Sequence, residues 1–482
     1  MTSGQVDTPN SAWQRPQLVL FGYALPVWRL AVVALVLLLA AGITFIPAPQ
    51  GMPQQSMVAL GLIGMTVVLW ATMVMPQPAA AVMFIALVIL TGAASPKAAV
   101  SGFFSSSLWL VFGGLLIGTA AERSGFGRFI ARRFLGRFRD SYSALVVGVI
   151  VGSTMLSFLV PSNMGRLAIT VPVVLALAKD AGYPLGSHGH IGLVLIAVVG
   201  NFAVAQGVLP GNLLNIMIVG AGETLYGIHV TYMHYLLMCG PVLGAVKAIL
   251  VWRFLVWMHP APTPRFDDGS AVDQLSPDAK RVGLILSIAI LLWATDFWHG
   301  IKPGWVALAA GALCVVPGIG VLPAREMINL RRLLIIVWVG TVLSLAAVMT
   351  ESGASALVSS VLARLAGVEG QPPIYGYFAM AYLSSLLATM STFGGAVPTM
   401  AAVAAEISNA TGLPLDTAVM SIAAGMSAIF FPYVAAPIVV GLVLGQVSQR
   451  AALPFMVVMA LVTCVLIIPL NGFWWWLIGE LP

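Results

Sequence analysis

The stretch Ser157-Phe-Leu-Val-Pro-Ser-Asn-Met-Gly-Arg-Leu-Ala-Ile-Thr-Val-Pro172 decides the fold, because it places helix-breaking residues inside an apolar segment. Apolar sequence leads in from Tyr142 and out to Ala178, and neither flank alone reaches the roughly 20 apolar residues that one membrane crossing needs. Ser and Asn favour helix N-caps. The pattern therefore predicts a helix that stops at Pro161 and starts again by Gly165, with a proline-kinked span as the alternative.

The composition of the chain is that of a membrane protein. Of its 482 residues, 60% are hydrophobic and only 8% are charged, which excludes a soluble domain and indicates a polytopic helical membrane protein. The excess of 22 basic over 16 acidic residues then reports topology and does not indicate a nucleic-acid partner. Inside a bilayer, the interruption at Pro161 to Gly165 is tolerated only where protein or a water-filled cavity covers it.

The distribution of apolar and polar segments divides the chain into five parts. These are a polar N-terminal tail at 1–27, a first transmembrane helix at 28–55, one repeat at 56–258, a polar connector at 259–281 and a second repeat at 282–482.

Two cationic features stand out in the first repeat. The Arg-rich segment from Glu122 to Asp140 interleaves its charges with aromatic and aliphatic residues, which predicts an amphipathic helix in the membrane interface. Lys247 and Arg253 are expected near the end of a later span, where their side chains would reach the lipid headgroups.

Three further interruptions follow the first. The hairpin predicted at 142–178 is followed by a charge-free segment at 191–222, which breaks near Val208 to Asn212. A second hairpin is predicted at 375–405, broken at Ser391 to Gly395, and a second charge-free segment at 417–449, broken near Phe431 to Pro437. Each break frees backbone N–H groups at a new helix N-terminus, which suits an anion.

The interruptions recur at one offset, which indicates an internal repeat. Gly125 and Gly353 lie 228 residues apart, Ser162 and Ser391 lie 229 apart, and Pro210 and Pro437 lie 227 apart. Lys and Arg placement predicts a cytoplasmic N-terminus, an external C-terminus and inverted halves. The sequence thus predicts an all-α polytopic membrane protein with about 11 transmembrane helices plus two re-entrant hairpins in two inverted repeats.

At this point the chain resembles the divalent anion/sodium symporter family, within the wider ion transporter superfamily. The family's Ser-Asn-Thr element is matched by Ser162-Asn163-Met164 and, in the second half, by Ser391-Thr392-Phe393. Its proline element is matched by Val208 to Asn212 and by Ala435-Ala436-Pro437. The resemblance implies a homodimer, a scaffold with an elevator-like transport part, and sulfate or di- and tricarboxylate substrates.

The elements together predict one substrate site. The candidate substrate-binding residues are Ser162, Asn163, Met164, Gly165, Arg166, Pro210, Gly211, Asn212, Ser391, Thr392, Phe393, Gly394 and Pro437. If sodium is the coupling ion, the resemblance implies ligands from Ser157, Ser162, Asn163, Ser391 and Thr392.

Three substitutions within these motifs predict the site's chemistry. Met164 and Phe393 replace both motif threonines, which favours a substrate with an organic body, such as a dicarboxylate or organosulfonate, over bare sulfate. Arg166 adds a permanent charge that suits a carboxylate and would repel sodium. We expect Arg166 to bind the substrate; the alternatives are a fixed acidic partner or a route for the side chain to the cytoplasm.

The function predicted from the sequence is a secondary active transporter of small anions in the inner (plasma) membrane. It would be cation-coupled or exchanging, with no cofactor other than sodium as a possible coupling ion, and with the lipid bilayer and a second copy as its partners. An anion channel and, less well supported, an intramembrane enzyme are the alternatives. The chain carries no nucleotide-binding loop that would indicate an ATP-driven pump.

Overall fold

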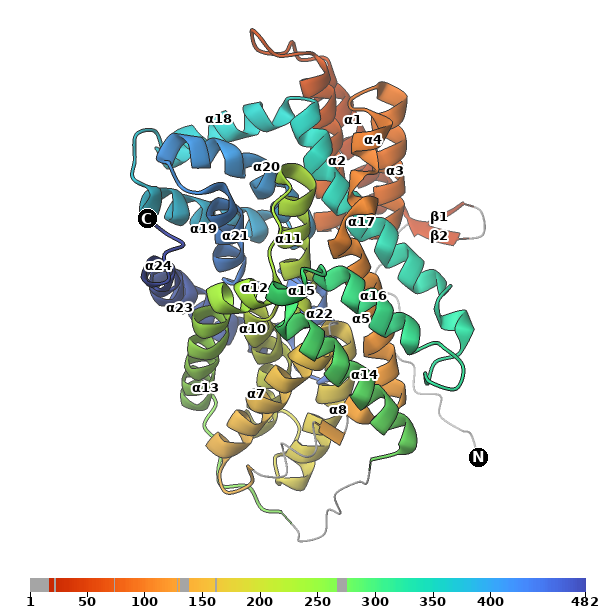
Figure 1. Ribbon diagram of the computed structural model, residues 1–482, viewed down its shortest axis with the longest axis vertical. Coiled ribbons are helices and arrows are strands. Elements are labelled where there is room, and N and C mark those ends of the chain that lie inside the picture. The colour runs from red at the N-terminus through yellow and green to blue at the C-terminus, as the bar shows by residue number, and fades with distance from the viewer. Residues whose placement is uncertain are drawn as a thin grey trace, which may run out of the picture.

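The computed structural model in Figure 1 describes residues 17–20, 23–72, 74–127, 129–130, 138–160, 163–266 and 275–482. Ser162 lies outside the described residues, as do positions 128 and 131–137 of the predicted interfacial helix, which therefore stays a prediction.

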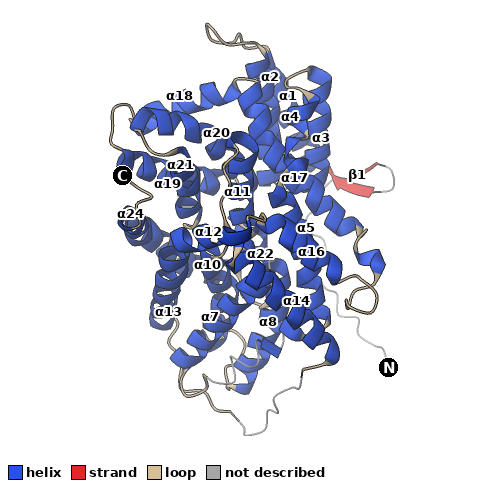
Figure 2. Ribbon diagram, viewed as in Figure 1, coloured by secondary structure: helices blue, strands red, loops and turns tan. Residues whose placement is uncertain are grey.

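Helices make up most of the described chain (Figure 2), which confirms the all-α prediction. The first part contains α1 (Val27–Thr44), α2 (Gln55–Thr72), α3 (Gln77–Thr91), α4 (Pro96–Ala99), η1 (Ser101–Phe104) and α5 (Ser106–Arg123). After the first hairpin and broken helix come α12 (Tyr232–Cys239), η5 (Gly240–Val246) and α13 (Lys247–Met258). The second part contains α14 (Pro277–Ala294), α15 (Asp296–His299), α16 (Pro303–Leu313), η6 (Ala324–Glu326), α17 (Leu330–Glu351) and α18 (Ala354–Ala366), and it ends with α23 (Gln449–Val462), η8 (Thr463–Ile467) and α24 (Ile468–Leu477).

A short β-hairpin precedes α1 and was not predicted. Strands β1 (Gln17–Leu20) and β2 (Tyr23–Pro26) pair antiparallel, with Gln17 opposite Pro26. Both strands lie inside the segment predicted as a polar tail, where the apolar runs are too short to be recognised by periodicity.

The hairpins form as predicted, and the proline-kinked span is wrong. Helix α7 (Tyr142–Leu159) is followed by α8 (Asn163–Asp180), and α19 (Pro373–Met390) by α20 (Phe393–Thr411). In Figure 1, α7 and α8 lie in the lower part of the molecule, whereas α19 and α20 lie in the upper part. The two hairpins thus enter from opposite ends, as inverted repeats require.

Each hairpin is followed by a broken helix, also as predicted. The first consists of α9 (His188–Leu195), η2 (Ile196–Gly200), α10 (Asn201–Val204), η3 (Ala205–Gly207), η4 (Leu209–Gly211) and α11 (Leu213–Tyr226). The second consists of α21 (Leu415–Met426), η7 (Pro432–Val434) and α22 (Ala436–Leu444). In the first, the Asn215 amide donates to the carbonyls of Ala205 at 2.9 Å and Val208 at 2.8 Å, because carbonyls freed by the break need donors.

Within the described chain, five helical segments are long and apolar enough to cross a bilayer by themselves: 55–72, 188–207, 232–258, 332–351 and 449–477. Shorter apolar helices pack against them, and α5 and α16 lie side by side over most of their length. One prediction about a span is wrong. Lys247 does not lie at the end of its span but opens α13, which continues to Met258, and its side chain is buried.

Candidate functional site

A cavity of about 280 Å³ lies where both hairpins and both broken helices meet. Its walls include the first residues of four helices: Asn163 and Met164 of α8, Leu213 of α11, Phe393 of α20, and Ala436 of α22. The rest of the wall comes from α5, α10, α17 and η7 and from Gln77 of α3. The chain therefore brings its four sequence-predicted breaks to one place.

None of the described residues that line the cavity is charged, yet the helix N-termini in its wall favour negative charge. A helix N-terminus carries about half a positive charge and unpaired N–H groups. No described residue accepts a hydrogen bond from the backbone N–H of Phe393 or Gly394, or from the hydroxyl of Thr392, and all three residues line the cavity. Four N-termini directed at one space suit a small anion with several oxygens.

Apolar side chains make up much of the cavity wall. Met164 is 45% exposed, and the Phe393 ring stacks on Phe202 with centroids 5.9 Å apart. Trp338 of α17 also lines the cavity. Both residues that replace the motif threonines thus line the cavity.

A polar network holds the first break. The Arg166 side chain is fully buried; its Nε donates to Asn201 Oδ1 at 2.9 Å, one Nη donates to the Val160 carbonyl at 2.8 Å, and the other donates to Asn163 Oδ1. Asn163 in turn donates from Nδ2 to Asn212 Oδ1 at 3.0 Å. The guanidinium therefore joins the end of α7, the start of α8 and the first broken helix.

This arrangement differs from all three expectations for Arg166. The side chain does not line the cavity, it forms no ion pair within the described ranges, and it is fully buried and so does not extend to the surface. A buried guanidinium without a carboxylate is held here by three neutral oxygens, because each replaces a water that burial removed.

Several other predicted site residues lie behind the cavity wall. Pro210, Gly211 and Ser391 are buried and do not line it, while Gly165 lines a neighbouring cavity. Asn163, Met164, Asn212, Thr392, Phe393, Gly394 and Pro437 do line it. The Ser157 hydroxyl donates to the carbonyls of Ser153 at 3.0 Å and Thr154 at 2.8 Å, within its own helix.

Further polar groups of the first broken helix carry no partner in the described structure. They are Asn201 Nδ2, both amide atoms of Gln206, Asn212 Nδ2 and Asn215 Oδ1. Unpaired buried amides of this kind mark a place where water or a ligand completes the bonding. A charge-free stretch that nevertheless contains several amides was the sequence signal for them.

A second cavity of about 280 Å³ adjoins the first, and Leu115 and Met164 line both. Arg332 lines this second cavity, and it donates to Glu326 Oε2 at 2.8 Å and to Thr119 Oγ1 at 2.9 Å. Arg123 also pairs with Glu326. Burial raises the pKa of the Glu326 carboxyl, but the hydrogen bond from Arg332 and the charge of Arg123 outweigh burial and lower that pKa below its usual value.

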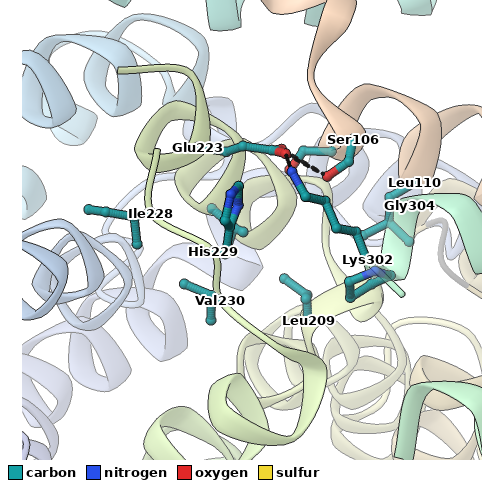
Figure 3. Close-up of a pocket in the computed structure, with 12 residues that line it drawn as sticks. Ser106, Leu110, Leu209, Glu223, Ile228, His229, Val230, Lys302 and Gly304 are labelled. Atoms are coloured by element: carbon teal, nitrogen blue, oxygen red, sulfur yellow. Dashed lines mark hydrogen bonds and ion pairs between the residues drawn. The ribbon is translucent and has the colours of Figure 1, made fainter. Parts of the chain in front are cut away.

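Figure 3 shows a further pocket, in which the side chains of Glu223, Lys302 and Ser106 meet in a cluster. Glu223, near the end of α11, accepts from Lys302 Nζ at 2.7 Å and from the hydroxyls of Ser105 and Ser106 at 2.9 and 2.8 Å. Lys302 precedes α16, and both serines stand at the start of α5. The cluster therefore joins the first broken helix to the α5 and α16 pair.

Comparison with known proteins agrees with this architecture. The model of the sodium:sulfate symporter transmembrane region matches residues 27–481. The inner membrane protein YbhI of Escherichia coli is 21% identical over 93% of this chain and 97% of its own. The citrate/succinate antiporter of the same organism is 27% identical over 60% of this chain and 66% of its own. The crystal structure of the Alcanivorax borkumensis YdaH transporter shares the fold, with a TM-score of 0.59 at 17% identity over 95% of this chain and 99% of that one.

Proposed function

Because the chain belongs to the family of the sodium:sulfate symporter transmembrane region, we propose that it is a secondary active transporter of small organic dianions in the inner membrane. One observation carries the proposal: four helix N-termini converge on one cavity that has no charged wall among the described residues. Partial charges can bind an anion and release it again, which a carrier needs, whereas several fixed cations would hold it.

The apolar part of the cavity wall supports a dicarboxylate as the substrate. Met164 and the stacked pair Phe393 and Phe202 offer surface to a short carbon chain, while the N–H groups of Phe393 and Gly394 and the Thr392 hydroxyl offer donors to a carboxylate. Bare sulfate would leave the apolar surface without a partner. A relative of this chain, the citrate/succinate antiporter, is named for substrates of the same class.

The mechanism that we propose is movement of the hairpins and broken helices against α5, α16 and α17. The adjoining cavity lined by Arg332 is then the cytoplasmic access, and the cluster of Glu223 and Lys302 closes the external side in this conformation. We propose a homodimer, whose scaffold would anchor such movement.

We further propose that sodium does not bind at the first break. A sodium ion needs several oxygens, and the oxygens of Val160, Asn163 and Asn201 already accept from Arg166. A guanidinium at that position also repels a second cation at short range. Arg166 would thus act as a resident positive charge that balances part of the substrate's charge without touching it.

Proteoliposomes that contain the purified protein test these proposals. We expect saturable counterflow of labelled succinate, competition by other dicarboxylates, weak competition by sulfate, and little dependence on a sodium gradient. Sulfate as the preferred substrate would overturn the substrate class, and strict dependence on external sodium would overturn the role of Arg166. Flux without counterflow would indicate a channel.

A further inference from the structure

Lys247 is, like Arg166, a buried basic residue in the part of the molecule that carries the site. Its side chain is 3% exposed, and its Nζ donates to the carbonyl of Ser427 at 2.5 Å. Within the described ranges, Lys247 forms no ion pair. An ammonium group buried without a carboxylate is costly, and lysine, unlike arginine, can release its proton.

The position of the amine is that of a coupling ion. Ser427 follows the last residue of α21, the first half of the second broken helix, so Nζ stands at the carbonyl end of a half-helix. Half-helix C-termini and unwound carbonyls are where broken-helix transporters hold Na⁺ or H⁺, because the helix dipole is negative there. The amine is enclosed, as a coupling ion must be while the site crosses the membrane.

The surrounding elements are irregular. Lys247 follows the π-helical turn η5, which packs against the π-helical turn η8, and such turns recur at functional sites. The titratable or charged side chains on the described elements packed around η5, α13 and α21, which ends beside Ser427, are Tyr142, Glu223, Tyr226, Tyr232, His234, Tyr235, Cys239, Arg253, Tyr375, Tyr377, Tyr382, Glu406, Asp416, Arg450 and Cys464. None of these described carboxylates forms an ion pair with the amine.

We propose that Lys247 binds the coupling proton of this transporter, which makes it a proton/dianion symporter; the inference rests on the proposed function. The electron pair of Nζ takes one proton from water on the side where the dianion enters, and returns it to water on the other side. With Arg166 permanently charged and Lys247 protonated, the two positive charges match the two negative charges of a dicarboxylate. The site with bound dicarboxylate then crosses the membrane without net charge. When Lys247 loses its proton, the charge of the empty site falls from +2 to +1, because only Arg166 stays charged.

The test compares wild type with Lys247→Arg, which cannot release its proton, and with the matched control Lys179→Arg on an exposed lysine of α8. Labelled succinate is offered to proteoliposomes at pH 6.5 outside and 8 inside, and at equal pH. Wild type and Lys179→Arg should accumulate label several-fold more under the gradient. Lys247→Arg should exchange internal for external succinate but show no added accumulation. Equal accumulation by Lys247→Arg, or exchange by wild type without any effect of the gradient, overturns the proposal.

A measurement without substrate separates this proposal from the proposed function. The unfolding temperature in detergent is followed from pH 6 to 9 for wild type and for Lys247→Met, which removes the amine and keeps an apolar stem. The difference between the two should change with pH, because only wild type binds a proton there. A difference that is constant with pH overturns the proposal, whether or not succinate is carried or Lys247→Arg folds.

Discussion

The two hairpin loops occupy equivalent places in the repeats, yet different forces hold them. At the first, Arg166 bonds to Val160, Asn163 and Asn201, and Asn163 bonds to Asn212. At the second, the Ser391 hydroxyl bonds only to backbone oxygens nearby, Phe393 stacks on Phe202, and Gly395 fits so closely against Val67 that an added Cβ would lie 2.7 Å from its side chain.

The two halves also differ in where a basic side chain stands. The first hairpin carries Arg166 itself. The second hairpin carries no basic residue at 373–411, and the second broken helix instead receives Lys247 from α13, whose Nζ donates to the Ser427 carbonyl. A network of polar bonds is more easily broken by one substitution than a packed apolar loop, because each lost donor leaves buried acceptors unpaired.

The largest expected effect follows from Asn163→Ala. This change removes the contact between the first hairpin and Asn212 and leaves one nitrogen of Arg166 without its acceptor. We predict that succinate uptake in proteoliposomes falls to the level of empty liposomes while the protein still inserts. The equivalent change Thr392→Ala should keep measurable uptake, since the Thr392 hydroxyl bonds to no described residue. Normal uptake by Asn163→Ala would refute the assignment of this loop.

Arg166→Gln should chiefly lower stability. Glutamine cannot reach all three oxygens, and each buried acceptor left without a donor costs about 1–3 kcal/mol. We predict a clear fall in unfolding temperature in detergent, with weaker transport as a consequence. Arg253→Gln, on an exposed arginine of α13, is the matched control and should change the free energy of unfolding by no more than about 0.5 kcal/mol. Equal stability of the two variants would show that the network does not hold the break.

Phe393→Thr tests whether the apolar second loop selects the substrate. It removes the stacking on Phe202 and places a hydroxyl at the N-terminus of α20, in the cavity wall. A hydrogen bond to a charged group contributes about 1.5–3 kcal/mol, so the preference for succinate over sulfate should shift toward sulfate by at least roughly tenfold. Inhibition constants for both anions against labelled succinate measure this ratio. An unchanged ratio would mean that Phe393 does not contact the substrate.

The smallest effect concerns Arg332, which unlike Arg166 has a carboxylate partner. Glu326 pairs with Arg332 and Arg123, and its pKa is lowered in the folded protein. A lowered folded-state pKa adds stability that is complete above the unfolded-state pKa of about 4.3 and is lost as pH falls through the folded-state value. We predict that wild type exceeds Glu326→Gln in unfolding temperature at pH 7, and that the gap closes below about pH 4. A gap that widens in acid would contradict this sign.

The amino-acid pattern was enough to predict the membrane class, the four helix breaks, the inverted repeat and seven residues that line the cavity. These predictions follow from hydropathy, from Pro, Gly and Asn inside apolar runs, and from a constant offset, all of which are local or periodic properties. Five other expected substrate-binding residues do not line the cavity, and Ser162 lies outside the described residues. The offset between Ser162 and Ser391 was enough to pair the two hairpins before their places in space were known.

The partners of the two buried basic side chains could not be predicted and became clear only from the folded chain. Arg166 meets Asn201, 35 residues away, and Lys247 meets Ser427, 180 residues away. The sequence pattern placed the first in the cavity and the second at the headgroups, and both expectations differ from what the structure shows. The partner of a buried charge is chosen by whichever oxygens packing brings within about 3 Å, and neither periodicity nor spacing along the chain carries that information.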